Sequence, residues 1–276
     1  MRERLSSLLS AQNALRTCSR LRRKLSHYNS RMIVISAMPK SGSTFLSYTL
    51  AAVTGYKHSY FGCANYNIEQ ELYLPKLIDA YGLGTVTQQH FKANTPNLNL
   101  LNDYGIRPIV LVRNIFDVIV SAREHLIQKS IHKADHESLP AVYIDKEFSQ
   151  LDVNQQIDFV IDMMAPWFLT YYVSWHNAAK DGFPFMWVYY EEARSDWPGI
   201  IKRVLDYCQI PKSMDDIVGA LTAMSHKPRE LVRLNQGIVG RGESTLSANQ
   251  RERILRLLRY YPSVDFSPVG LIRPKG

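Results

Sequence analysis

The feature that most constrains this chain is an apolar run followed at once by a short loop of small polar residues. The run covers residues 32–35 (MIVI), and the loop covers residues 39–45 (PKSGSTF). This pattern predicts a buried strand, a tight turn that contains glycine, and then a helix. Such a turn directs several backbone N–H groups and a helix N-terminus at one point, where proteins commonly bind phosphate.

The position of the lysine separates this loop from the common ATP-binding loop. A Walker A loop reads G-x-x-x-x-G-K-[ST], with its lysine directly after the last glycine. Here Ser43 follows Gly42, Lys40 comes two residues before that glycine, and Ala37 stands at the first Walker glycine. We therefore predict a phosphate loop that is not that of an ordinary ATPase.

Short apolar segments recur along the chain, and each is followed by a segment with helical periodicity. Strands are expected at Met32–Ala37, Thr85–Gln89, Ile109–Val112 and Phe185–Tyr189. Helices are expected at Ser43–Val53, Phe116–Lys129, Asn154–Ala179, Trp197–Cys208, Met214–Ala223 and Ala248–Tyr260. This alternation predicts an α/β fold of three α/β/α layers, with helices on both faces of a central parallel sheet.

Polar residues follow the predicted strands at the end where parallel sheets bind ligands. The loop at 39–45 follows the first strand, and His90, Arg113 and Tyr190 follow the others. Because ligands bind beyond the carboxyl ends of parallel strands, we expect these groups to converge.

A second motif covers residues 111–121 (LVRNIFDVIVS). Arg113 leaves the end of a predicted strand, and Ser121 lies eight residues later in the next helix. An arginine fork suits a phosphate group, and a serine hydroxyl can add a further bond. The alternative is that Arg113 simply pairs with the carboxylate of Asp117.

The two motifs together resemble those of the sulfotransferases that use 3'-phosphoadenosine 5'-phosphosulfate. Members of that family carry P-K-[ST]-G-[ST]-T-[WF] and, later in the chain, R-N-x-x-D-V-x-V-S. The similarity extends over roughly residues 32–260, through Trp167, Trp175 and the Tyr190-Glu191-Glu192 triplet. It implies a P-loop-like sulfotransferase architecture, of the kind found in bacterial enzymes that act on small molecules.

The resemblance also implies roles for individual residues. Lys40 would contact the oxygen that bridges sulfate and the leaving nucleotide, Phe45 would stack on adenine, and Tyr190 would meet the adenine edge. The implied donor-binding residues are Lys40, Ser41, Gly42, Ser43, Thr44, Phe45, Arg113, Ser121, Tyr190, Arg241 and Gly242. The implied catalytic residues are Lys40, Ser121 and His90, which matches the family's catalytic histidine.

The chemistry of the residues agrees with this assignment. An acceptor must lose a proton as it attacks sulfur, and a histidine, whose ordinary pKa is about 6.5, can take that proton at neutral pH. A fixed lysine stabilises the charge that grows on the departing oxygen. We expect no metal, because the transferred sulfuryl group carries only one charge, unlike a γ-phosphoryl group. The sequence agrees, since Arg113 ends the strand where a kinase often places an aspartate.

The sequence departs from the family pattern in several places. Gln88 stands where the family often has a lysine, two residues before the histidine. The loop at residues 235–243 differs from that of the animal cytosolic enzymes, so Arg233 stays an alternative to Arg241 for closing over the 3'-phosphate. The dimer motif of those enzymes is not found, and a homodimer stays open.

Charge is concentrated at the N-terminus. The chain carries a formal net charge of +8, and its first 31 residues hold eight Arg or Lys and one acid. We expect a basic helical extension at 1–31, either packed on the domain or lying on a membrane surface, and one sulfotransferase domain at 32–276. The nearly neutral remainder predicts no nucleic-acid partner, and no apolar run is long enough for a transmembrane segment. Three widely spaced cysteines, Cys18, Cys63 and Cys208, favour a reducing, cytoplasmic location.

The acceptor is expected to be a small molecule bound by residues 56–74 and 123–165. The second segment holds eight acidic and four basic residues. An acidic lining with aromatic residues would suit a cationic acceptor, whereas the alternative is that these acids face water. The resemblance implies sulfuryl transfer to a hydroxyl or to an amine or carbamoyl nitrogen of a small molecule. A P-loop kinase and a non-catalytic nucleotide-binding protein are the alternatives.

Overall fold

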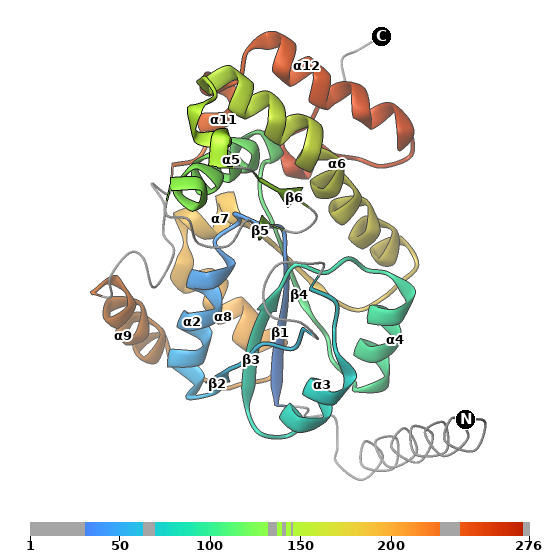
Figure 1. Cartoon of the computed structure of the whole chain (residues 1–276). Helices are drawn as coiled ribbons and strands as arrows, with labels where there is room; N and C mark the ends of the chain where they lie inside the picture. The colour runs from blue at the N-terminus through green and yellow to red at the C-terminus, as the bar shows by residue number, and fades with distance from the viewer. Residues whose placement is uncertain are drawn as a thin grey trace, which may run out of the picture.

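The computed structural model describes residues 31–62, 70–131, 137–139, 142–144, 146–226 and 238–272. The predicted N-terminal extension, apart from Arg31, lies outside these residues, as do Cys18, Cys63 and Arg233. Figure 1 shows the arrangement of the described elements.

A sheet of five parallel strands forms the centre of the molecule. Its order is β2 (Lys57–His58), β3 (Thr85–Gln89), β1 (Met32–Ala37), β4 (Ile109–Val112) and β7 (Met186–Tyr189). Four of these strands are predicted from the sequence, and β7 begins one residue later than expected. The sequence gives no sign of the two-residue strand β2, or of the antiparallel pair β5 (Glu137–Leu139) and β6 (Val142–Tyr143).

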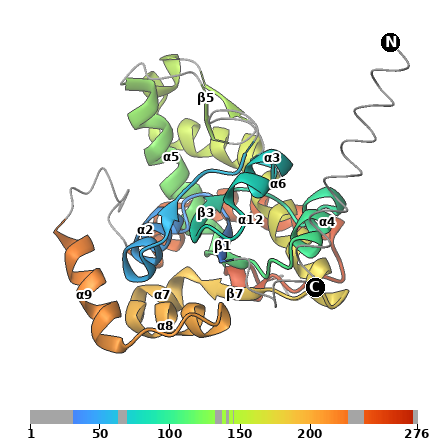
Figure 2. The ribbon, with the colours of Figure 1, turned by 90° about the horizontal axis from the view of Figure 1, so that it is seen from below.

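One face of the sheet packs against four helices. These are α2 (Ser43–Thr54), α7 (Tyr190–Ser195), α8 (Trp197–Tyr207) and α9 (Met214–Ser225). Alternate residues of β1, namely Ile33, Ile35 and Ala37, are buried in this layer together with Leu46 and Val204. Figure 2 shows α2, α7 and α8 along this side of the sheet.

The opposite face is covered by a second set of helices. They are α3 (Leu74–Ala80), α4 (Thr95–Asp103), α5 (Ile115–Ile131) and α6 (Val153–Lys180). Val34 of β1 and Val110 and Val112 of β4 are buried there against Trp175 and Phe168 of α6. Because both sheet faces are covered by helices, the predicted three-layer α/β architecture is confirmed.

The chain after α9 adds the short helices α11 (Arg241–Thr245) and α12 (Ala248–Arg256). They lie with α5 beyond the carboxyl end of the sheet (Figure 1). The last predicted helix is shorter than expected, since residues 257–260 form a 3-10 turn, η2 (Leu257–Tyr260). Two further 3-10 segments are η1 (Lys146–Gln150) and η3 (Ser267–Val269).

Local sequence explains where several helices begin and end. Asp152 accepts hydrogen bonds from the backbone N–H groups of Asn154 and Gln155 and so caps α6, and Ser247 caps α12 in the same way through Gln250. Gly55 ends α2 in the left-handed conformation that glycine adopts readily. In the described part of the chain no helix combines the length and apolar character needed to cross a bilayer.

Candidate active site

The phosphate loop turns sharply between β1 and α2. Lys40 and Gly42 both have positive φ angles, 66° and 83°, which is unusual for a lysine. Gly42 must be glycine for a second reason, because a Cβ there would lie 2.9 Å from Cε2 of the Tyr190 ring. The Ser41 hydroxyl donates to the carbonyl of Met38, so the turn is also held from within. The predicted strand, glycine turn and helix are thus observed.

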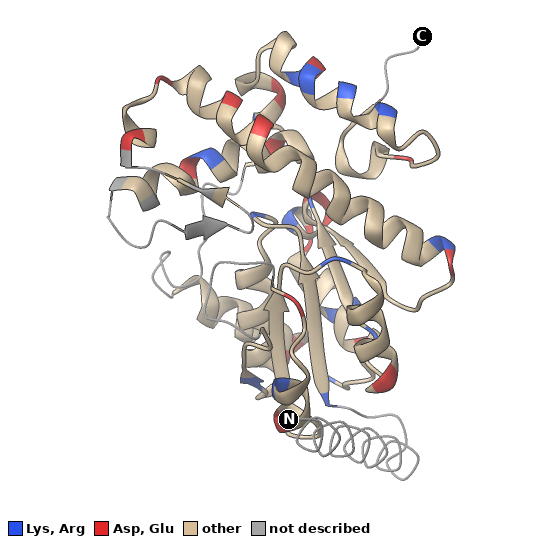
Figure 3. Cartoon of the chain, turned by 45° about the vertical axis from the view of Figure 1, so that its right-hand side comes forward, with Lys and Arg blue, Asp and Glu red and all other residues tan. Residues whose placement is uncertain are grey.

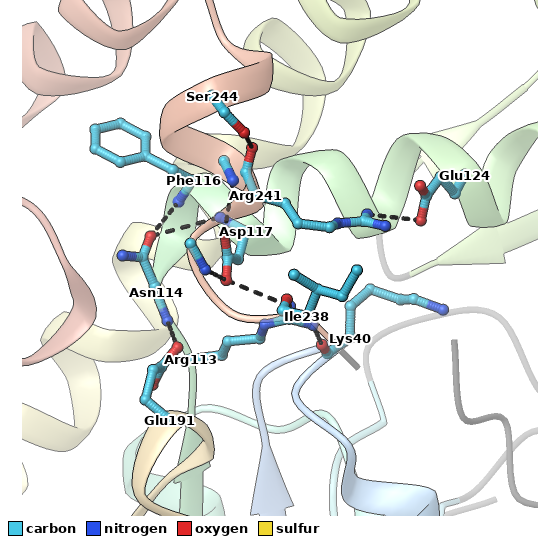
Figure 4. A network of polar contacts seen from close by, with 12 residues as sticks. Lys40, Arg113, Asn114, Phe116, Asp117, Glu124, Glu191, Ile238, Arg241 and Ser244 are labelled. Atoms are coloured by element: carbon cyan, nitrogen blue, oxygen red, sulfur yellow. Dashed lines mark hydrogen bonds and ion pairs between the residues drawn. The ribbon is translucent and has the colours of Figure 1, made fainter. Parts of the chain in front are cut away.

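Arg113 ties this loop to two other segments. Its guanidinium donates to the Lys40 carbonyl at 3.0 Å and to the Ile238 carbonyl at 3.1 Å (Figure 4). It also lies 4.3 Å above the Tyr190 ring and 3.4 Å from the Asp117 carboxylate, the partner considered in the sequence. Arg113 is 6% exposed, and its buried Nε–H has no hydrogen-bond partner among the described residues. A buried donor of this kind is costly unless something satisfies it.

Asp117 holds the segment that returns to the site from the C-terminal part of the chain. It is buried, and its two oxygens accept the backbone N–H groups of Gly240 at 2.9 Å and Gly242 at 2.7 Å. A Cβ on Gly242 would lie 2.3 Å from the carbonyl carbon of Phe116, so only glycine fits at this contact. The N–H of Gly242, a residue that the resemblance lists as donor-binding, is therefore directed at a carboxylate of the protein.

Arg241 does not join Arg113. Its guanidinium lies 2.8 Å from the Glu124 carboxylate on α5, with the two side chains 14% and 23% exposed. Figure 4 shows Arg241 directed along α5 toward Glu124. Ser121 lies on α5 between Asp117 and Glu124 and is 3% exposed. The alternative residue, Arg233, lies outside the described residues.

The two aromatic residues expected near adenine are largely covered by protein. Tyr190 is 3% exposed, between Arg113 and Gly42. Phe45 is 7% exposed and packs on the ring of Trp197, with ring centroids 4.8 Å apart. The sequence marks Trp197 only as the first residue of an expected helix.

His90 follows β3, and its ring is oriented by the neighbouring strand. Nδ1 lies 2.8 Å from the carbonyl oxygen of Ala37, the last residue of β1. Because a carbonyl can only accept, Nδ1 carries the proton, and in the neutral ring Nε2 has the lone pair. The backbone N–H of His90 donates to the side chain of Gln70 at 2.9 Å, a contact that the sequence did not reveal.

A buried polar cluster fixes the chain immediately after His90. The Ser36 hydroxyl donates to the Phe91 carbonyl at 2.7 Å, and it lies 3.0 Å from the Tyr171 hydroxyl. The indole N–H of Trp175 donates to the Ser36 hydroxyl at 3.1 Å. Burial raises the pKa of Tyr171, so its hydroxyl stays protonated. The tryptophan noted in the sequence thus links α6 to the histidine loop.

Several acids expected on the acceptor side have structural partners. Asp158 and Asp162 of α6 pair with Arg253 of α12, and Figure 3 shows basic residues gathered on α12 beside acidic residues of α6. Asp152 caps α6, and Glu124 pairs with Arg241. These four carboxylates therefore already have partners within the protein.

Comparison with known proteins identifies the family. The sequence matches the sulfotransferase domain family over residues 30–252. The chain belongs to the sulfotransferase family. A search of the curated proteins found no match.

Solved structures confirm the sulfotransferase fold. Mouse sulfotransferase SULT7A1, complexed with PAP, is 14% identical with a TM-score of 0.60, over 88% of this chain and 87% of that one. A retinol dehydratase in complex with androsterone and the inactive cofactor PAP is 13% identical with a TM-score of 0.55, over 89% and 83%. At such identities the similarity concerns the fold alone. Within the residues described for this sulfotransferase, no three His, Cys, Asp or Glu side chains are grouped to hold a metal.

Proposed function

We propose that this sulfotransferase moves a sulfuryl group from 3'-phosphoadenosine 5'-phosphosulfate to a hydroxyl or to an amine or carbamoyl nitrogen of a small molecule. The observation that carries the proposal is the order of three adjacent strands. β3, β1 and β4 lie side by side, and they end in His90, the Lys40 loop and Arg113 respectively. A candidate base, a candidate leaving-group cation and a candidate phosphate ligand thus meet at one sheet edge.

Arg113 supports a donor with two phosphate sites. The turn at residues 39–44 and the N-terminus of α2 suit the 5'-phosphosulfate. Arg113 leaves the neighbouring strand, its Nε–H is buried without a partner among the described residues, and Ser121 follows on α5. A 3'-phosphate oxygen would satisfy that donor, which makes adenosine 3',5'-bisphosphate the expected product nucleotide.

The transfer step follows from the orientation of His90. Nε2 takes the proton of the acceptor as the acceptor atom forms its bond to sulfur. The bond between sulfur and the bridging oxygen breaks, and its electron pair leaves with the nucleotide, where Lys40 stabilises the charge. The Ala37 carbonyl accepts from Nδ1–H and so stabilises the imidazolium that forms.

Thermal denaturation with added nucleotide tests the donor assignment. A ligand at a hundred times its Kd stabilises the folded state by about 2.7 kcal/mol, which raises Tm by several degrees. We expect that shift with adenosine 3',5'-bisphosphate and none with ATP and Mg²⁺. The reverse result would favour the P-loop kinase. Stabilisation by the bisphosphate without turnover on a broad panel of acceptors would favour the non-catalytic alternative.

A further inference from the structure

The segment Ile238–Gly242 is attached to helix α5 at two places. Asp117 accepts the backbone N–H groups on either side of Arg241, so the backbone of Arg241 lies beside Asp117. The Arg241 guanidinium instead lies at Glu124, seven residues further along α5. Seven residues of α-helix rise about 10 Å, which an arginine can span only when it is extended.

The path of Arg241 crosses the face of α5 that points to the candidate donor site. Residues 117, 121 and 124 follow the spacing of i, i+4 and i+7, so they share one face of the helix. The side chain of Arg241 therefore runs past the turn that carries Ser121, and Figure 4 shows its guanidinium away from Arg113.

We propose that Arg241 is a strut, paired with Glu124, and not a ligand of the nucleotide phosphate. The strut holds Ile238–Gly242 on α5, and the Ile238 carbonyl in turn accepts a hydrogen bond from Arg113 at 3.1 Å. Glu124 and Arg241 are thus positioning residues that act on the donor site through the closing segment and Arg113. This inference rests on the proposed function for its effect on nucleotide binding.

The geometry of the pair favours a strut over a ligand. Both side chains are mostly shielded from water, and a shielded carboxylate without its cation is unfavourable. An arginine that moved from Glu124 to a phosphate would give up this shielded ion pair. The backbone on both sides of Arg241 is also fixed, because Gly240 and Gly242 donate to Asp117. The Arg241 carbonyl accepts a hydrogen bond from the Ser244 hydroxyl at 3.0 Å, which further restricts backbone movement.

A charge swap distinguishes a strut from a phosphate ligand at Arg241. We expect Glu124→Ala and Arg241→Ala each to raise the Kd for adenosine 3',5'-bisphosphate about tenfold, measured by titration calorimetry. The double variant Glu124→Arg/Arg241→Glu restores the pair with reversed charges and should bring the Kd back to within about threefold of wild type. If Arg241 contacts the phosphate, the swap places a carboxylate against it, and the double variant binds no better than Arg241→Ala. That result, or a loss with Arg241→Ala and none with Glu124→Ala, overturns the strut.

Amide exchange tests the strut without nucleotide. The N–H groups of Gly240 and Gly242 should exchange faster in both single variants and return to the wild-type rate in the swap. Unchanged exchange in the single variants overturns the strut. If wild type binds no bisphosphate, the proposed function fails, while exchange still decides the strut. Glu252→Ala is the matched control, because its pair with Arg256 is exposed on α12 and should affect neither measurement.

Discussion

At the scale of single residues, the orientation of His90 decides what it can do. A histidine after a strand is commonly structural, and His90 does make a structural bond, from Nδ1 to the Ala37 carbonyl. The same bond leaves Nε2 as the nitrogen that can accept a proton. One contact thus holds the ring and, in the proposed mechanism, selects Nε2 as the reactive atom.

Replacing His90 tests this role. His90→Ala should lower kcat by roughly 10²–10⁴-fold, the usual contribution of a general base, because no group takes the acceptor proton. The Kd for adenosine 3',5'-bisphosphate should stay at the wild-type value. His226→Ala, at an exposed histidine after α9, is the control and should keep full turnover. Turnover that survives in His90→Ala would mean that the base lies elsewhere.

Glu191 offers a second test at this scale. Its carboxylate accepts the backbone N–H of Asn114 at 2.8 Å, yet burial raises its pKa above the ordinary value of 4.5, with the Asn114 bond opposing part of that rise. The folded state therefore binds this proton more tightly than the unfolded state does. Its contribution to stability is complete below the unfolded pKa and is lost as pH rises through the folded pKa.

Glu191→Gln should remove the loss of stability at higher pH, because glutamine does not ionise, and its side-chain oxygen can still accept the Asn114 N–H. We expect its Tm at pH 7 to equal or exceed that of wild type, with the difference shrinking at pH 4. Melting curves between these pH values provide the measurement. Glu192→Gln, at a half-exposed neighbour that pairs with Arg203, should show no gain of this kind. A Glu191→Gln protein that is less stable at every pH would contradict the prediction.

At the scale of elements, the contact between α5 and α11 depends on the absence of one side chain. A Cβ on Gly242 would meet the backbone of Phe116 and Asp117, and backbone cannot move aside as a flexible side chain can. The two elements are therefore locked at a spacing that only glycine permits.

Gly242→Ala should destabilise the protein by about 1–3 kcal/mol, the usual cost of overpacking, and should weaken nucleotide binding by displacing the closing segment. Chemical denaturation and calorimetry measure the two effects. Gly219→Ala is the matched control, because a Cβ there meets nothing within 4 Å in the middle of α9. That variant should be neutral or gain about 0.5–1 kcal/mol from better helix propensity. Equal stability of the two variants would show that α11 moves freely.

At the scale of the whole molecule, the position of the loop after His90 depends on α6, a helix that lies far from His90 in the sequence. Tyr171 and Trp175 of α6 both contact the Ser36 hydroxyl on β1, and the Trp175 indole N–H also lies 3.3 Å from the carbonyl oxygen of Phe91. The histidine loop is thus held by β1, β3 and α6 together.

Trp175→Phe tests this connection. The ring volume is reduced and the N–H lost, which leaves buried oxygens of Ser36 and Phe91 with one donor fewer, so we expect a loss of about 1–3 kcal/mol in stability. Turnover should fall while nucleotide affinity is retained, because the change displaces the histidine loop and not the phosphate loop. Trp187→Phe, at a tryptophan that packs on Phe185 in the same aromatic layer, should leave turnover intact. Equal turnover in both variants would show that α6 does not position the histidine loop.

The sequence alone predicted four of the five central strands and the longer helices, because each has an apolar pattern of its own. It missed β2 and the helices α3, α4, α7 and α11, and all of these except α4 are too short to show a period. It predicted Lys40, Arg113 and His90 as site residues, through their places after strands and through the resemblance to sulfotransferase motifs. Three contacts could not be predicted, because each joins segments far apart in the chain. They are the bond from His90 to Gln70, the bonds from Gly240 and Gly242 to Asp117, and the ion pair of Arg241 with Glu124.

The sequence by itself determined the layered α/β fold, the phosphate loop and the sulfotransferase family, since these follow from local periodicity and from motifs of adjacent residues. Only the tertiary structure decided which groups already have partners. In the folded chain Arg241 pairs with Glu124 and the Gly242 N–H donates to Asp117. Four acids of the expected acceptor side also have partners within the protein. Ion pairs and hydrogen bonds form between groups that folding brings together, and their strength depends on distance and burial, which no spacing along the chain records.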